Sequence, residues 1–278
     1  MSVHPKPIFG TPVGEGPLLV LIHGAFVDSR YWAPNVEELS RDFRILPVNL
    51  PGAYPDRDSN ADHTGAEHVA FLTALLHQQP DGAHVLGHSR GGRLALHLAA
   101  QAPEKVRSLI LAEPGGQMEP DFSKLIERPG DSDPGWAKEA RAGALALLEK
   151  GELEDAARFY IDTSQGDGQW AAAPPLFRQI APDNIATLRW ISKDDTVRFS
   201  THLAKQVRAR TLLLVGTESP QIFGRIATAL LSCIPNVTQA HIEGAGHFLN
   251  LTHRERFDQL ARDFLLEVEQ ARSSGLVG

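Results

Sequence analysis

The sequence predicts an α/β fold, a doubly wound, mostly parallel central sheet covered by helices and carrying an inserted helical cap. Two observations lead to this expectation. Short apolar runs alternate with longer amphipathic segments, strand first and helix second, as in parallel sheets whose crossovers are helical. Between about residues 117 and 207 the alternation stops and only helical periodicity continues.

Six runs rich in apolar and β-branched residues are the expected strands. Each ends at Gly, Pro, His or an acidic residue, which is typical of buried strands. The runs are Leu18–Ile22, Arg44–Val48, Ala83–Leu86, Ser108–Ala112, Thr211–Val215 and Thr238–Ile242. The segments Thr64-Gly-Ala-Glu67 and Thr252-His-Arg-Glu255 predict capping boxes at the beginning of two helices.

The stretch without strands predicts a separate helical unit. Its expected helices are Trp136–Lys150, Leu153–Ile161 and Phe177–Ile191, with Gly-, Pro- and Asp-rich breaks between them. We therefore expect residues 1–116 and 208–272 to form the core, residues 117–207 to form a cap over the strand ends, and residues 273–278 to form a flexible tail.

Composition excludes several classes of function. Of the 278 residues, 27 are Lys or Arg and 34 are Asp or Glu, so the net charge is −7 and no basic cluster favours nucleic acid or an anionic membrane. The apolar run Leu18–Ile22 is far shorter than a membrane span, which needs about 20 residues. The first residues lack the apolar segment of a secretory signal, so we expect a cytoplasmic protein. The single cysteine, Cys233, excludes an intramolecular disulfide and is expected to be buried at a helix end.

The strongest chemical signal is the segment Gly87-His-Ser89-Arg-Gly91, which follows an expected strand and precedes a helical run. A serine on a sharp strand-to-helix turn needs small residues two positions before and after it, because the backbone is crowded there. Gly87 and Gly91 meet this requirement. Ser89 is therefore the predicted nucleophile.

A serine needs a base within hydrogen-bonding reach, and the candidate is His247, in the tight loop Gly244-Ala-Gly-His247 after the last expected strand. His84 and His88 are four residues apart, but a strand and a turn intervene, so no metal site is expected. The histidines expected to be solvated or to lie on helix faces are His4, His63, His68, His77, His97, His202 and His253.

The segment His23-Gly24-Ala25-Phe26, at the end of the first expected strand, is the second backbone feature of interest. Acyl transfer develops an oxyanion, and two N–H donors aimed at it lower the barrier substantially. The expected donors are the backbone N–H groups of Ala25 and Arg90. We expect the Arg90 side chain to be a packing or salt-bridging group.

These motifs resemble the α/β-hydrolase superfamily, and among its members the capped serine esterases and lactonases. The matching segments occur in family order: His23-Gly24-Ala25 through Trp32, Asn49-Leu-Pro-Gly52, Gly87-His-Ser-Arg-Gly91 and Gly244-Ala-Gly-His247. The resemblance implies a Ser–acid–His triad, an oxyanion hole and a helical cap. Asn49 stands where many members have Asp, and we interpret it as structural.

The triad acid departs from the family pattern. The usual position, three residues after the glycine that ends the penultimate strand, holds Ser219, which with Pro220 suits a helix N-terminus. Two replacements are available. Glu113 follows the strand Ser108–Ala112, a position that some branches of the family use, and Glu218 is one residue from the usual place. Glu113 is the preferred acid and Glu218 the alternative.

The expected function is hydrolysis of a carboxylic ester or lactone of a small, fairly apolar molecule, without cofactor or metal. Dehalogenase and epoxide hydrolase branches carry Asp at the nucleophile position, whereas Ser89 favours acyl transfer. The alternatives are carbon–carbon bond hydrolysis, hydroxynitrile cleavage, cofactor-free oxygenation, and a non-catalytic receptor for a small ligand. The residues expected to contact substrate are Phe26, Trp136, Trp170, Phe177 and Trp190.

Overall fold

The computed structural model describes residues 11–56, 63–127, 136–191 and 193–275. Its centre is a parallel sheet of six strands in the order β2-β1-β3-β4-β5-β6, so the predicted fold class is correct. The strands are β1 (Leu18–Ile22), β2 (Arg44–Val48), β3 (Ala83–His88), β4 (Val106–Ala112), β5 (Arg210–Gly216) and β6 (Val237–Ile242). Every predicted strand is present, and β3 and β4 each extend two residues beyond the prediction.

The register of the sheet brings its functional strand ends to one edge. Gly87 of β3 pairs with Ile22 of β1 and with Leu111 of β4. Ala112 of β4 pairs in turn with Leu214 of β5. Because all these strands run in the same direction, the residues that follow them meet at the carboxyl edge of the sheet.

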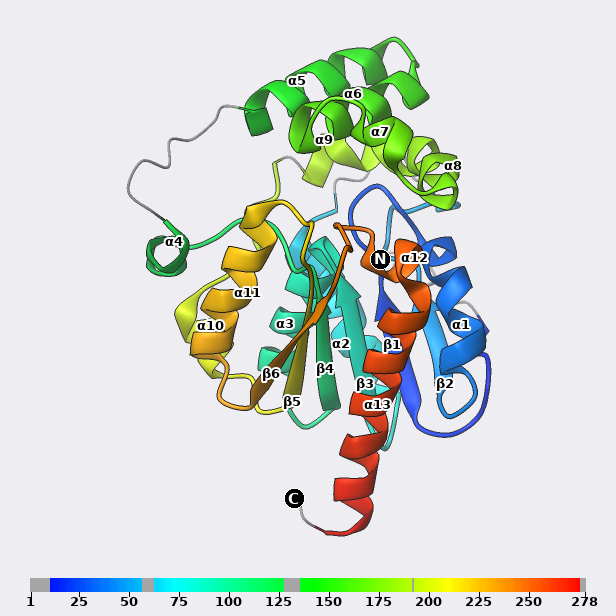
Figure 1. Cartoon of the computed structure of the whole chain (residues 1–278), viewed down its shortest axis with the longest axis vertical. Coiled ribbons are helices and arrows are strands. Elements are labelled where there is room, and N and C mark those ends of the chain that lie inside the picture. The colour runs from blue at the N-terminus through cyan, green and yellow to red at the C-terminus, as the bar shows by residue number, and fades with distance from the viewer. Residues whose placement is uncertain (1–10, 57–62, 128–135, 192, 276–278) are drawn as a thin grey trace, which may run out of the picture.

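Helices cover both faces of the sheet (Figure 1). One face packs against α1 and α13, and the other against α2, α3 and α11. Smaller elements, among them the 3₁₀ helix η1, connect these layers. The elements are η1 (Ser29–Trp32), α1 (Ala33–Leu39), α2 (Gly65–His77), α3 (Arg90–Gln101), α4 (Pro120–Ile126), α10 (Thr201–Lys205), α11 (Gln221–Cys233), α12 (Leu249–Thr252) and α13 (Arg254–Ser273).

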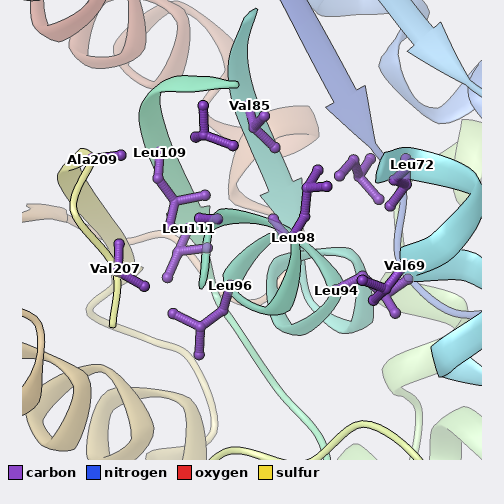
Figure 2. Packing of buried hydrophobic residues seen from close by; sticks show 14 of the residues in the cluster. Val69, Leu72, Val85, Leu94, Leu96, Leu98, Leu109, Leu111, Val207 and Ala209 are labelled. Atoms are coloured by element: carbon purple, nitrogen blue, oxygen red, sulfur yellow. The ribbon is translucent and has the colours of Figure 1, made fainter. Parts of the chain in front are cut away.

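The core on the α3 side is a continuous layer of aliphatic side chains. Figure 2 shows leucines of α3 between side chains of β3 and β4 and side chains of α2. Leu94, Leu96 and Leu98 are fully buried there. Burying a leucine stabilises the fold by about 1.5–3 kcal/mol, so this layer fixes the helix that follows the predicted nucleophile.

A layer of helices lies beyond the carboxyl edge of the sheet (Figure 1). It consists of α5 (Trp136–Glu149), α6 (Leu153–Gln165), α7 (Gln169–Ala172), α8 (Pro175–Asn184), the 3₁₀ helix η2 (Ile185–Thr187) and α9 (Leu188–Ile191). We refer to α5–α9 as the cap. The predicted helix Phe177–Ile191 is thus divided into three short elements, with the buried Asn184 at the first break.

Buried and half-buried hydrogen bonds tie the cap to the core. The side chain of Asn184 donates to Asp28 Oδ2 (2.7 Å) and accepts from the N–H of Tyr54 (2.8 Å). Arg30 Nη2 joins Asp28 Oδ2 (2.7 Å) and Asp183 Oδ2 (2.8 Å). Charge-assisted bonds of this kind are the stronger ones, so they fix the position of α8 above the sheet.

Three local predictions had different outcomes. The capping box of Thr64 and Glu67 is confirmed at the start of α2. The one predicted at Thr252 is wrong: α13 follows His253 without a side-chain cap, and the Thr252 hydroxyl donates back to Phe248 O (3.2 Å) within α12. Cys233 is buried at the last residue of α11, as predicted. Among the described helices, none combines the length and apolar composition needed to cross a bilayer.

Candidate active site

Ser89 lies on a sharp turn between β3 and α3, with φ 54° and ψ −119°. Its backbone N–H donates to Ala112 O (2.9 Å), while its carbonyl accepts from the N–H of Gly92 (3.0 Å) in the first turn of α3. These bonds hold the serine in a conformation that L-residues seldom adopt. The turn therefore has the shape of a nucleophile elbow.

The two glycines of the motif are sterically required. A Cβ at Gly87 would lie 2.3 Å from Gly91 O, and a Cβ at Gly91 would lie 2.3 Å from Ile22 O. Neither contact is compatible with a side chain. The space predicted from the sequence is therefore needed for the elbow to close against β1.

His247 and Glu113 meet beside this turn. His247 Nδ1 is 3.3 Å from Glu113 Oε2, and Glu113 Oε1 accepts the N–H of Gly216 (2.7 Å). The carboxylate is fully buried. Glu218 is exposed and makes no hydrogen bond to His247 within the described chain. Of the two predicted acids, the structure therefore pairs His247 with Glu113.

Ser89 and His247 line the same pocket. No hydrogen bond joins the Ser89 hydroxyl to the imidazole in the described part of the chain. Catalytic hydrogen bonds are often long or poorly aligned before substrate binds. The three side chains are therefore arranged as a serine, a base and an orienting acid, and the hydrogen bond between the serine and the base is not formed among the described residues.

Backbone strain is concentrated at this site. Among the described residues, three other than glycine have a positive φ: Phe26 (61°), Ser89 (54°) and Glu113 (48°). Each follows closely on the carboxyl end of β1, β3 or β4. Such conformations cost about 1–3 kcal/mol each and persist where the surrounding structure imposes them. Their clustering supports the prediction that the site lies at the carboxyl edge of the sheet.

His88 connects the two segments that carry Ser89 and His247. Its Nε2 is 2.8 Å from His247 O, and since a carbonyl oxygen only accepts, Nε2 carries the proton. Burial holds the pKa of His88 well below its usual value, so the ring is neutral. Its centroid lies 4.8 Å from that of His247 and 5.1 Å from that of Tyr31. His88 thus fixes the backbone of the predicted base.

A buried polar network lies behind Tyr31. The Tyr31 hydroxyl donates to Asn250 Oδ1 (2.7 Å), and Asn35 Nδ2 donates to Asn250 O (3.0 Å) and Asp258 Oδ1 (2.7 Å). Burial raises the pKa of Asp258 to about 7. The network anchors α12 and α13, which follow the His247 loop, to η1 and α1.

The predicted oxyanion donors are free of protein partners. Within the described residues, the N–H groups of Ala25 and Arg90 donate to no other group. The adjacent His23 organises its loop, because Nδ1 donates to Gly24 O (2.9 Å) and Nε2 accepts from the N–H of Leu50 (3.2 Å). Burial lowers the pKa of His23 to about 4, which keeps the ring neutral and this pattern intact.

The Arg90 side chain points away from the pocket. Its Nη2 lies 2.9 Å from His68 Nδ1 and 3.8 Å from Asp194 Oδ2, and its guanidinium lies over the Trp190 ring. His68 lies in α2, one of the two places expected for it, but it is not solvated. His68 is fully buried, and both of its ring nitrogens have partners there, Nδ1 in Arg90 and Nε2 in Pro51 O (2.9 Å), which offsets the cost of burying the ring.

The pocket beside Ser89 has a volume of about 170 Å³. Phe26 and Phe177, both predicted contacts, line it. Trp170 lies behind Phe177 at 6.1 Å between ring centroids, and Trp190 lines a separate small cavity with Arg90. The side chain of Trp136 lies outside the described part of the structure.

Sequence reasoning missed several lining residues. Phe223 of α11 stacks on His247 with 4.0 Å between centroids, and Phe248 contacts Phe177 at 4.5 Å. Tyr31 and Tyr160 also line the pocket. The position of Phe248, next to the predicted base, was a usable signal. For the others, helical spacing gave no distinction between core and pocket.

Other predicted features have structural roles. His84 Nδ1 bonds Ser108 Oγ (2.7 Å) and its Nε2 lies 3.1 Å from Glu269. In the described ranges, no three His, Cys, Asp or Glu side chains converge on a possible metal position. Asn49 accepts from the N–H of Ser29 (2.7 Å) and so holds a turn. The N-cap of α11 is Pro220 rather than Ser219, whose buried hydroxyl has no hydrogen-bond partner among the described residues.

Fold and site together define an α/β enzyme with a serine elbow and a histidine–carboxylate pair. The sequence model of the alpha/beta hydrolase fold matches residues 17–254. The chain therefore belongs to the alpha/beta hydrolase fold family.

Curated relatives include esterases and other hydrolases. A pimeloyl-[acyl-carrier protein] methyl ester esterase of Vibrio parahaemolyticus is 38% identical over 97 residues. That match spans only 35% of this chain and 36% of the relative. A 2-hydroxymuconate semialdehyde hydrolase of Pseudomonas sp. (strain CF600) is 28% identical over 274 residues, 94% of this chain and 91% of the relative.

Solved structures share the fold over nearly the whole chain. MenH from S. aureus has a TM-score of 0.73 at 21% identity, covering 96% of this chain and 100% of its own. A thermophilic esterase from Thermogutta terrifontis has a TM-score of 0.72 at 22% identity, covering 94% and 93%. At these identities the likeness establishes the fold.

Proposed function

We propose that the protein is a serine hydrolase that cleaves a carboxylic ester or lactone of a small, fairly apolar molecule through an acyl-enzyme. The observation that carries this proposal is the pairing of the buried Glu113 with His247 beside Ser89 at a strained elbow (3.3 Å). An imidazole held by a buried carboxylate is suited to accept a hydroxyl proton.

In the proposed mechanism, Ser89 Oγ attacks the substrate carbonyl while His247 Nε2 takes the hydroxyl proton. The oxyanion of the tetrahedral intermediate accepts hydrogen bonds from the N–H groups of Ala25 and Arg90. His247 then protonates the leaving alcohol, which leaves an acyl group on Ser89. Water, deprotonated by His247, releases the acid and regenerates the serine. Glu113 keeps the Nδ1–H tautomer and stabilises the imidazolium.

The surroundings of Ser89 support an ester or lactone as the substrate. The lining is largely aromatic and aliphatic, which suits an uncharged organic group. Similarity to a pimeloyl-[acyl-carrier protein] methyl ester esterase, though confined to 35% of this chain, supports the same class of bond.

A second candidate is hydrolysis of a carbon–carbon bond in a ketone substrate. It is favoured by the similarity to a 2-hydroxymuconate semialdehyde hydrolase over 94% of this chain. The same serine, histidine and N–H donors would serve that reaction. The two candidates differ in the leaving group, an alcohol in one and a carbanion in the other.

Hydrolysis of short-chain ethyl esters, γ- and δ-lactones and 1,3-diketones by the wild type and by Ser89→Ala tests the proposal. We expect ester or lactone hydrolysis that falls by at least about 10³-fold in Ser89→Ala. Cleavage of the diketones alone would favour the second candidate. Ester hydrolysis that persists in Ser89→Ala would contradict the proposed nucleophile.

A further inference from the structure

One face of the cap helix α6 forms a wall of the pocket. Tyr160, Ile161, Ser164 and Gln165 all line it. Residues four positions apart are neighbours on a helix surface, so the pairs Tyr160–Ser164 and Ile161–Gln165 form two adjacent rows along α6. Three of these four side chains carry uncharged hydrogen-bonding groups, whereas the pocket residues from the β1 loop and α11 are mainly apolar.

The hydrogen-bonding capacity of this wall is largely unused. Within the described residues, neither the Tyr160 hydroxyl nor the Gln165 amide makes a hydrogen bond. The Ser164 hydroxyl donates weakly to Ile161 O (3.3 Å) within the helix, which leaves its oxygen free to accept. A polar wall in a pocket, left without protein partners, is available to a ligand.

Tyr160 is the best-positioned of the three. Its ring meets that of Phe26 edge to face, with 4.8 Å between centroids. Phe26 follows Ala25, whose N–H is a proposed oxyanion donor. Burial raises the pKa of Tyr160, so its hydroxyl keeps its proton at neutral pH and can donate. The Tyr160 ring therefore lies beside the loop that carries the Ala25 donor, in the same pocket as Ser89.

The pocket lining lacks fixed charge. Within the described chain, no Lys, Arg, Asp or Glu lines it, and His88 is held neutral by burial. Arg90 is occupied by His68 and Asp194. Arg141 of α5 acts on Tyr160 electrostatically without lining the pocket. An anionic substrate group would lose part of its hydration here without gaining an oppositely charged partner, which is unfavourable even if an uncharged donor contacts it.

We propose that the acyl part of the substrate is uncharged and carries an oxygen atom, a keto, hydroxyl or ether oxygen, that accepts a hydrogen bond from the Tyr160 hydroxyl near the scissile carbonyl. This proposal rests on the proposed ester hydrolysis. Ser164 and Gln165 extend the same wall for further contact with an oxygen-bearing chain.

Three esters of nearly identical shape test it: ethyl pentanoate, ethyl 4-oxopentanoate and monoethyl succinate. Ethyl 4-oxopentanoate has a keto oxygen that ethyl pentanoate lacks. Monoethyl succinate has a carboxylate oxygen in place of the terminal methyl group of ethyl 4-oxopentanoate. Initial rates would be measured by pH-stat and corrected with Ser89→Ala. We expect kcat/KM to be about tenfold higher for 4-oxopentanoate than for pentanoate, the value of one hydrogen bond, and at least about 100-fold lower for monoethyl succinate than for 4-oxopentanoate.

Two tyrosine variants test whether the Tyr160 hydroxyl causes the preference for ethyl 4-oxopentanoate over ethyl pentanoate. Tyr160→Phe should reduce the ratio of 4-oxopentanoate to pentanoate from about ten to about one. Tyr54→Phe, the same substitution at a tyrosine outside this pocket, should keep the ratio near ten.

The outcomes separate the two proposals. If hydrolysis depends on Ser89 and kcat/KM for monoethyl succinate equals or exceeds that for ethyl 4-oxopentanoate, this inference is overturned and the esterase proposal stands. If the preference for monoethyl succinate is then lost in Arg141→Gln, Arg141 is the residue that recognises the carboxylate. Equal rates for the first two esters, or a ratio unchanged in Tyr160→Phe, would also overturn it. Absence of Ser89-dependent hydrolysis of any ester would overturn both.

Discussion

The core and the cap meet at one pocket and contribute different chemistry to it. From the core come Ser89, His247 and the buried Glu113, on a backbone strained at two of these three positions. From the cap come Tyr160 and Phe177, which are uncharged. In the proposed mechanism these two regions have separate tasks: buried pairings at strand ends carry out the reaction, and a helix surface selects the substrate.

Among the described residues, most of the buried polar groups lie on the core side of this division. The networks around His23, His88 and Asp258 belong to core strands, loops and helices. In the cap, the buried Asn184 side chain donates to Asp28 Oδ2, and the buried Thr187 hydroxyl donates to Asn184 O. Substitutions in the core should therefore change turnover and pH response, and those in the cap should change substrate affinity.

The largest effect should come from the acid. Glu113→Gln keeps the shape of the side chain but cannot favour the required imidazole tautomer, so we expect kcat to fall about 10³–10⁴-fold with little change in KM. Glu218→Gln is the matched control and should stay within twofold of the wild type. The opposite result, with the loss in Glu218→Gln alone, would assign the acid to the loop after β5.

The second effect concerns stability in the core. The pKa of Asp258 is raised from 3.8 to about 7, so the folded state binds a proton that the unfolded state releases above pH 4. The contribution of Asp258 is therefore fully present below about pH 4 and lost as the pH rises through 7.

We expect this contribution to fall by about 2 kcal/mol between pH 5 and pH 8. Asp258→Asn should abolish that part of the pH dependence, measured as the free energy of unfolding in urea at both pH values. Asp263→Asn, at an exposed position of the same helix, should leave it intact. If the unfolding free energy of Asp258→Asn has the wild-type pH dependence, the Asp258 carboxyl group does not cause the loss of stability between pH 5 and pH 8.

A smaller effect is expected at His88. His88→Phe retains a ring beside Tyr31 but loses the donor to His247 O (2.8 Å). We expect kcat to fall about tenfold, with KM within twofold, because one positioning hydrogen bond is lost. His88→Gln supplies an N–H and should recover part of kcat. A Phe variant with wild-type kcat would show that the loop needs no such contact.

The smallest effect should come from Phe177, the pocket residue that α8 of the cap contributes. Phe177→Leu weakens aromatic contacts to Phe248 (4.5 Å) and Trp170 (6.1 Å), and we expect KM for ethyl pentanoate to rise about three- to fivefold with kcat within twofold. Phe122→Leu, buried against Phe199 away from the pocket, removes a similar ring and should leave KM unchanged. A fall in kcat in Phe177→Leu would contradict the division between cap and core.

The strands and the elbow could be predicted because their causes are local. Apolar runs must be buried, and Gly87 and Gly91 are required wherever a serine turn closes this tightly. The acid could not be chosen from spacing, because its position depends on the pairing of β4 with β5. That pairing brings the N–H of Gly216 to Glu113 (2.7 Å), a contact between residues far apart in the sequence.

The cap was the least predictable region for the same reason. Trp170, Phe177 and Trp190 have similar helical surroundings in the sequence, yet Phe177 faces the pocket and the two tryptophans do not line it. Which side of a cap helix faces Ser89 depends on how Asn184 is held by Asp28 and Tyr54. The burial of His68 against Arg90 is likewise a tertiary contact that helical spacing alone does not reveal.

The most direct test of the central claim is to locate the adduct formed by a fluorophosphonate probe, using intact mass followed by peptide mapping. A single adduct on Ser89, absent from Ser89→Ala and formed much more slowly in Glu113→Gln, is the predicted result. An adduct on another residue, or ester turnover without any adduct on Ser89, would contradict the account.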